Sequence, residues 1–159
     1  MAQQPYNQNR GGGYQGGGGY QQREQQPEFN LNEEKNNIER WVKDGIDKAT
    51  ISFAEEFGRY VANNDLTTSQ IRTVFGEMRR IQMNNYTSEK TDFILLKPKL
   101  AYAVKRHNKK GLTKFFDFFS LGYEAVDTTN DENGKKHFEN LMNLMEAVLA
   151  YHKYHGGKE

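Results

Sequence analysis

Regular spacing of apolar residues constrains the fold of this chain more than any other feature. From residue 28 onward, apolar side chains recur every three or four positions, which places them along one face of an α-helix. No run of alternating β-branched residues exceeds four or five positions, so strands are not expected. The spacing predicts an all-α fold, a compact bundle of five to six helices over residues 28–159.

Caps and helix breakers indicate the bounds of the first three helices. Asn32 is a candidate N-cap for the first helix, and the second is expected over residues 48–63. The third opens at Thr67, because this hydroxyl and the Gln three residues later have the spacing of a capping box, and it ends near Asn84. The loops between these helices are short, as in a helical bundle.

The remaining chain is expected to form three more helices. The fourth runs from residue 91 to about residue 107 and contains Pro98, where we expect a kink because proline lacks an N–H group and clashes with the preceding turn. A phenylalanine-rich fifth helix follows Gly111. A polar loop over residues 127–134 then leads to a strongly amphipathic last helix.

Several aromatic residues have two interpretations, packing in the core or contact with a partner. Helical spacing and neighbouring aliphatic residues assign three phenylalanines of the fifth helix to the core: Phe115, Phe116 and Phe119. Phe118 is left outside this assignment, since aromatic side chains also stack on bases. Leu144 and Tyr151 lie seven residues apart on the last helix, where they form either a wide core face or a contact with another subunit.

Residues 1–27 have a different composition from the rest of the chain. They contain eight Gln, seven Gly and three Tyr but no Ile, Leu, Val or Phe, so they cannot bury enough apolar surface to order themselves. Arg10 and the three glycines after it faintly resemble the RGG segments that contact RNA, although a solvated leader is the favoured interpretation. We predict a disordered low-complexity tail.

Composition also excludes several classes of protein. The chain has no cysteine, which rules out disulfides and Cys-ligated zinc, and it has no apolar run long enough for a membrane span. Its first residues lack the apolar stretch of a secretory signal. We therefore expect a soluble cytoplasmic protein that does not associate with membranes.

No sequence motif predicts catalysis, a metal site or a cofactor. The chain lacks a phosphate-binding loop, an HExxH motif and a nucleophile elbow. His152 and His155 lie three residues apart, but their position beside two glycines favours a solvated helix end over a metal site. We predict that the protein is not an enzyme and has no catalytic residue, metal or cofactor.

The charge distribution along the chain is uneven and suggests an anionic partner. The formal net charge is only +1, yet residues 67–116 hold eleven basic and three acidic groups. The segments on either side of this block are acidic. Because a merely solvated surface usually mixes both signs, the block favours contact with nucleic acid.

A helical wheel arranges part of this basic block into two stripes. Residues seven apart differ by about 20° on an α-helix, so Arg72 and Arg79 share one stripe, with Arg80 beside it. Lys99 and Arg106 share another, with Tyr102 between them on nearly the same line and Lys105 adjacent. Cationic side chains spaced along a helix bind phosphates without reading sequence. The alternative is a helical protein-interaction adaptor whose basic surface binds an acidic partner.

Two segments of the chain resemble the signature segments of a known family. They are LTTSQIR at residues 66–72 and LKPKLAYAVKR at residues 96–106. Together they are similar to the Csm small-subunit family of type III-A CRISPR effector complexes, over roughly residues 35–155. The leader is not part of the family core, and its role is left open.

The resemblance implies a compact, all-helical, non-catalytic subunit that serves in antiviral defence. Several copies of such a subunit stack beside the backbone and large subunits of the complex and help to hold the duplex of guide RNA and target RNA. The RNA-binding residues implied by the motif positions and their neighbours are Arg72, Arg79, Lys97, Lys99, Lys105 and Arg106.

Overall fold

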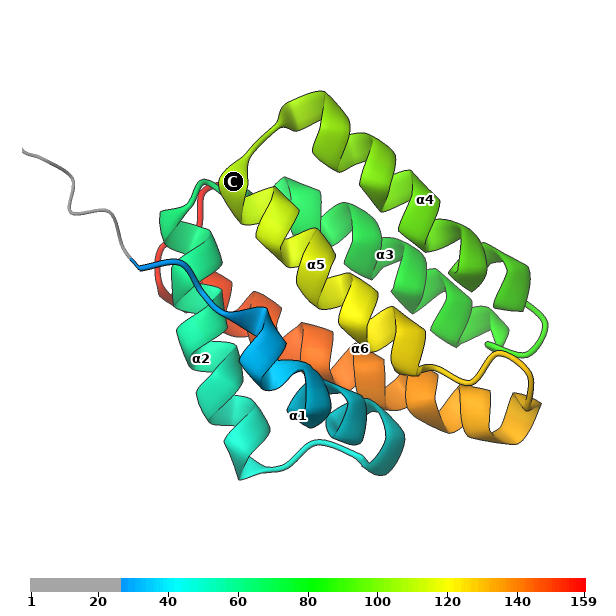
Figure 1. The fold of residues 1–159 in the computed structure, drawn as a ribbon. Coiled ribbons are helices and arrows are strands. Elements are labelled where there is room, and N and C mark those ends of the chain that lie inside the picture. The colour runs from blue at the N-terminus through cyan, green and yellow to red at the C-terminus, as the bar shows by residue number, and fades with distance from the viewer. Residues whose placement is uncertain (1–26) are drawn as a thin grey trace, which may run out of the picture.

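A computed structural model describes residues 27–159, in which every regular element is an α-helix (Figure 1). The helices are α1 (Leu31–Asp44), α2 (Lys48–Asn63), α3 (Thr68–Asn84), α4 (Lys90–His107), α5 (Lys110–Ala125) and α6 (Asp131–Tyr154). The predicted all-α bundle is confirmed. Apart from Pro27, the predicted tail lies outside the described residues.

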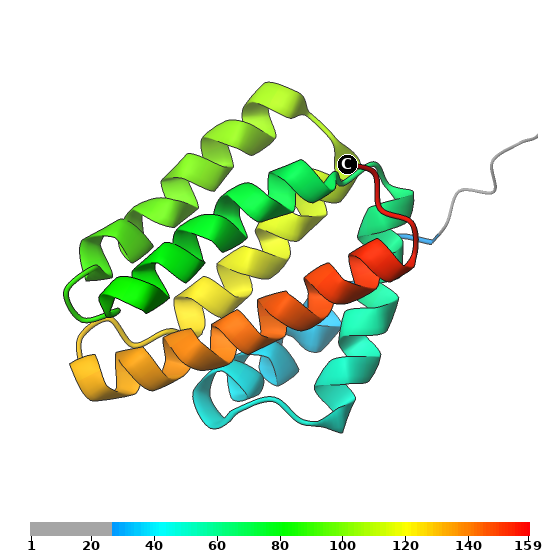
Figure 2. The same cartoon turned by 180° about the vertical axis from the view of Figure 1, so that it is seen from behind.

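Much of the bundle packs against the long helix α6. It contacts α1, α2 and α3, while α5 fills the space between these helices and α4. Helix α4 lies at one edge of the bundle and packs on α3 and α5, so its outer side faces away from the core (Figures 1 and 2). No helix formed by residues 27–159 is long and apolar enough to span a membrane.

Side-chain caps fix the starts of the first and third helices. The predicted capping box of α3 is confirmed: Thr67 Oγ1 accepts from the Gln70 N–H at 3.2 Å, and Gln70 Oε1 accepts from the Thr67 N–H at 3.0 Å. The cap of α1 is Asn30, whose Oδ1 accepts from the Asn32 N–H at 3.1 Å. The prediction of Asn32 was wrong because α1 begins earlier and buries Leu31.

The last two helices begin earlier than predicted because glycines fit inside their first turns. Helix α5 includes Gly111, whose N–H donates to the Asn64 carbonyl at 2.9 Å; a Cβ there would lie 2.6 Å from the same oxygen. Helix α6 is capped by Asn130 and includes Gly134, which lies too close to Tyr86 for a side chain. The predicted loop therefore ends at residue 130.

The core is rich in aromatic side chains, and it corrects the assignment of the phenylalanines. Phe115 and Phe119 are fully buried as predicted, and Phe116 is half-buried and packs against the core. Phe118 is also fully buried, with its ring centre 4.9 Å from that of Phe57, so it belongs to the core as well. On α6, Leu144 is buried and Tyr151 is half-buried against the core, so the interpretation as a wide core face is correct.

Helix α4 continues through Pro98 because a neighbouring helix replaces the lost hydrogen bond. Proline has no N–H group, so it cannot donate to the carbonyl four residues earlier, at Ile94. Tyr123 of α5 donates its hydroxyl to this carbonyl at 3.0 Å. The hydrogen bond from Tyr123 therefore links α5 to α4, and α4 is not interrupted at the proline.

Residues 155–159, here called the C-terminal strap, fold back across the start of α3. The Thr68 N–H donates to the Lys158 carbonyl at 2.6 Å. Under the strap lies His152, which is fully buried with Nε2 2.6 Å from the Leu66 carbonyl; a Cβ on Gly157 would overlap its ring. The prediction of a solvated His152 was therefore wrong.

Candidate nucleic-acid interface

The two arginines of the α3 stripe point toward α6 and the C-terminal strap. Arg79 Nη2 lies 3.5 Å from Glu146 Oε1 on α6, and its guanidinium lies 5.2 Å from the centre of the Phe75 ring. Arg72 Nη1 lies 3.5 Å from Glu159 Oε2 in the strap. Both arginines are exposed, but each already faces a carboxylate.

Arg80 points the other way, toward α4, and connects the two helices. Its guanidinium donates to Asp92 Oδ2 at 2.7 Å and to Glu89 Oε2 at 3.1 Å, and it also lies 3.4 Å from Glu77. The hydrogen bond from Arg80 lowers the pKa of Asp92, and the hydrogen bond with Glu89 adds to this effect. The expectation that Arg80 flanks the arginine stripe was wrong, because this side chain is held in a structural network on the other side of α3.

Three exposed cations of the basic block lie in the second half of α4. Lys99, Lys105 and Arg106, here called the α4 cation cluster, are exposed. Among residues 27–159 none of the three has a partner in an ion pair or side-chain hydrogen bond. Two of them lie in the last turn of the helix, where the partial negative charge of the backbone carbonyls favours positive side chains. Their charges are therefore available to an external anion.

A groove between α3 and α4 shows which way this cluster faces. It has a volume of about 230 Å³ and a mainly apolar lining that includes Val74 and Leu100, and Lys99 lies at its edge. Arg106 lies seven residues after Lys99 and therefore on the same side of α4. Lys99 therefore borders the α3 side of the helix, and Arg106 lies about 20° further round α4, toward Tyr102.

Lys97 lies on the opposite side of α4. Its Nζ is 2.5 Å from Glu124 Oε1 and 5.4 Å from the centre of the Tyr123 ring, and both partners belong to α5. The structure thus brings Lys99, Lys105 and Arg106 together on α4, but it directs Lys97 toward α5 and the two α3 arginines toward α6. RNA contact by all six residues stays a prediction.

The part of the chain that the structure describes has no group of three or more His, Asp or Glu residues that could hold a metal ion. Burial lowers the pKa of His152 and of His137, so both imidazoles favour the neutral form. His137 Nδ1 accepts from the Asp127 N–H at 3.1 Å. Both histidines are thus part of the packing of the fold, although Nδ1 of His152 is buried without a hydrogen-bond partner among the described residues.

Sequence reasoning missed the acidic partners of the basic block. Five of them lie outside residues 67–116: Glu28, Glu124, Asp131, Glu146 and Glu159. A signal was present, because the segment after residue 116 is acidic. Which of its carboxylates meets which cation depends on how α5, α6 and the strap pack.

Fold and surface together define a class: a small all-α protein whose edge helix carries three exposed cations without an ion-pair partner in the described part of the chain. A model of the Csm2 Type III-A family matches residues 46–158. The chain therefore belongs to the Csm2 Type III-A family and is a small subunit of a type III-A CRISPR complex. No curated protein and no solved structure matches it. The family resemblance of the two sequence segments is thus confirmed.

Proposed function

We propose that this chain is a non-catalytic RNA-binding subunit that helps to hold the duplex of guide RNA and target RNA through backbone phosphates. The observation that carries the proposal is the α4 cation cluster, three exposed cations without a partner in the described part of the chain. Phosphate contacts of this kind fix position and do not read sequence. Sequence recognition is left to pairing between guide and target, as in other RNA-guided systems.

The α4 cation cluster contributes more to binding than the arginines of α3. An unpaired cation gives up only water when it meets a phosphate, whereas Arg72 and Arg79 must also leave Glu159 and Glu146. Exposed pairs of that kind contribute about 0–1 kcal/mol, so phosphate can displace them at a small cost. Lys97, held by Glu124 on the other side of α4, is a supporting contact.

The wider setting of this proposal follows from family membership. A type III-A complex contains other subunits, and we propose that this chain contacts the backbone and large subunits and further copies of itself, in the cytoplasm. The acidic segments on either side of the basic block are candidate surfaces for these protein contacts. Their negative charge would repel phosphate, so RNA would bind at the edge of the bundle that carries the α4 cation cluster.

The test compares two variants that lose the same number of positive charges. In one, the three residues of the α4 cation cluster are replaced by alanine. The control replaces three exposed lysines of α6: Lys135, Lys136 and Lys153. Affinity of the assembled complex for the guide–target duplex is measured over a range of salt concentrations.

Each lost phosphate contact is expected to reduce the slope of log affinity against log salt by somewhat under one unit. In the α4 variant this slope is therefore expected to fall by up to three times that amount, whereas the α6 control keeps the native slope. Equal slopes in the native chain and the α4 variant would contradict the proposal. If heparin and unrelated RNA fail to displace the ligand of α4, the adaptor interpretation is correct instead.

A further inference from the structure

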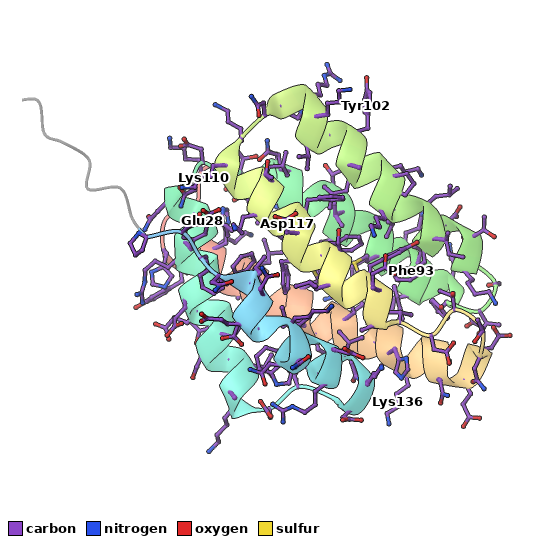
Figure 3. All side chains as sticks on the ribbon, viewed as in Figure 1. Glu28, Phe93, Tyr102, Lys110, Asp117 and Lys136 are labelled. Carbon is purple, nitrogen blue, oxygen red and sulfur yellow. The ribbon has the colours of Figure 1, made fainter. Side chains whose placement is uncertain are left out.

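Tyr102 is the most exposed large hydrophobic side chain of α4. Its side chain projects from the outer side of the helix, away from the bundle (Figure 3), and the residue is 69% exposed. A single exposed aromatic ring is common on protein surfaces, so its meaning depends on the residues around it. Tyr154 is similarly exposed, at 76%, but its ring packs against His155 with 4.9 Å between ring centres. No ring contact or hydrogen bond holds Tyr102 among residues 27–159.

Two unpaired cations lie on either side of this ring along the helix. Lys99 is three residues before Tyr102 and Arg106 is four residues after it, which are the spacings that place side chains on one helical face. The helical rise separates them from Tyr102 by about 4.5 Å and about 6 Å. Leu95, 43% exposed, extends the apolar surface by two turns. The surface is thus an aromatic plane between two positive charges.

We propose that Tyr102 stacks on one unpaired base of bound RNA while Lys99 and Arg106 hold the phosphates on either side of that nucleotide. This inference rests on the proposed function and adds a single-stranded element to it. Bases inside a duplex are covered on both faces, so the ring needs a base at a strand end or at an unpaired position. All four bases have a π-face, so the site is expected to tolerate any sequence.

The charges around the ring favour RNA over a protein partner. Asp92 is the only acid within α4, near the far end of the helix, and Arg80 holds it. Asp92 lies ten residues before Tyr102 and interacts electrostatically with Lys99, and Glu77 of α3 lines the groove beside Lys99. Arg80 forms ion pairs with both carboxylates, which reduces their repulsion of a phosphate near Tyr102. Within one turn of the ring, α4 carries three exposed cations, Lys99, Lys105 and Arg106, and no acid. A negatively charged ligand fits these neighbours better than an apolar protein surface does.

The experiment measures binding of the full chain to two labelled probes, a short single-stranded RNA and the same RNA in a blunt duplex. The variants are Tyr102→Ala and Tyr102→Phe, with Tyr154→Ala as the matched control for loss of an exposed tyrosine. Stacking on one base corresponds to about 1–3 kcal/mol, so Tyr102→Ala is expected to weaken single-strand binding about 5- to 150-fold. Tyr102→Phe and Tyr154→Ala are expected to bind like the native chain.

Two further readouts separate stacking from charge. Tyr102→Ala is expected to keep the native salt slope, because no charge is lost, and to bind the blunt duplex normally. Native affinity of Tyr102→Ala for the single strand would overturn the inference, as would an equal loss in Tyr102→Phe, which would point to the hydroxyl. Loss of complex assembly with native RNA binding would show that the ring contacts a protein. Absence of single-strand binding by the native chain at low salt would also overturn it.

The experiments distinguish failure of the stacking site from failure of the proposed function. If Tyr102→Ala has no effect while alanine substitution of the α4 cation cluster reduces the salt slope, the proposed function stands and the stacking site does not. If neither change alters binding, both fail.

Discussion

The hydroxyl of Tyr123 is predicted to stabilise the protein because Pro98 leaves the Ile94 carbonyl without a helical donor. In the native chain the tyrosine supplies that donor at 3.0 Å. Tyr123→Phe removes the hydroxyl and keeps the ring. A hydrogen bond of this kind contributes about 0.5–1.5 kcal/mol net, and water can reach the partly exposed Ile94, so we expect a loss near 1 kcal/mol.

The same substitution has a different effect once residue 98 can donate. In Pro98→Ala the new backbone N–H can form the regular helical bond to the Ile94 carbonyl, so Tyr123→Phe then loses little. The two substitutions are expected to couple by about 0.5–1 kcal/mol. Free energies of unfolding from urea titrations of the native chain, both single variants and the double variant give this coupling directly.

Tyr151→Phe is the control, because the Tyr151 ring packs against its neighbours and no side-chain hydrogen bond holds its hydroxyl in the described residues. It should change the free energy of unfolding by only a few tenths of a kcal/mol. An equal cost of Tyr123→Phe in the proline and alanine backgrounds would refute the reasoning. The hydroxyl would then stabilise the protein by a route independent of the missing donor.

Three other substitutions test separate parts of the structure. Gly111→Ala forces a methyl group against the Asn64 carbonyl, and urea unfolding is expected to show a loss of about 1–3 kcal/mol. Burial lowers the pKa of His152 from its ordinary 6.5, so its neutral form stabilises the fold above pH 6.5 and this stability is lost as the pH falls. His152→Gln should therefore give a flatter melting-temperature profile below pH 6.5; an unchanged profile would contradict this. Arg80→Gln is expected to lower the melting temperature at neutral pH, with a difference from the native chain that shrinks as the pH falls and Asp92 takes up a proton, because the hydrogen bond from Arg80 holds the pKa of Asp92 below its ordinary value.

Local signals predict the helices well where the determinants of a boundary are close in sequence. The capping box of Thr67 and Gln70 needs only four residues, so the amino-acid pattern alone is enough to place the start of α3. The predicted starts of α5 and α6 were wrong because Gly111 and Gly134 act through distant partners. A glycine in a tight helix crossing is indistinguishable in sequence from a glycine that ends a helix.

The candidate site was predicted only where its residues belong to one helix, because contacts between distant parts of the chain leave no local signal in the sequence. Helical periodicity correctly grouped Lys99 with Arg106, since both belong to one helix. It could not show that Arg72 meets Glu159, which is distant in sequence and belongs to the C-terminal strap. The burial of His152 was missed for the same cause, because its partner is the carbonyl of Leu66.

The last turn of α4 has a consequence for mutational work on this protein. Lys105 and Arg106 sit where the exposed carbonyl ends of the helix already attract positive charge, so the fold itself favours basic residues there. Selection for thermal stability and selection for ligand affinity would retain the same side chains. Replacing them by neutral residues therefore changes both the stability of the fold and the affinity for a ligand. The melting temperature of each such variant needs to be measured together with its affinity.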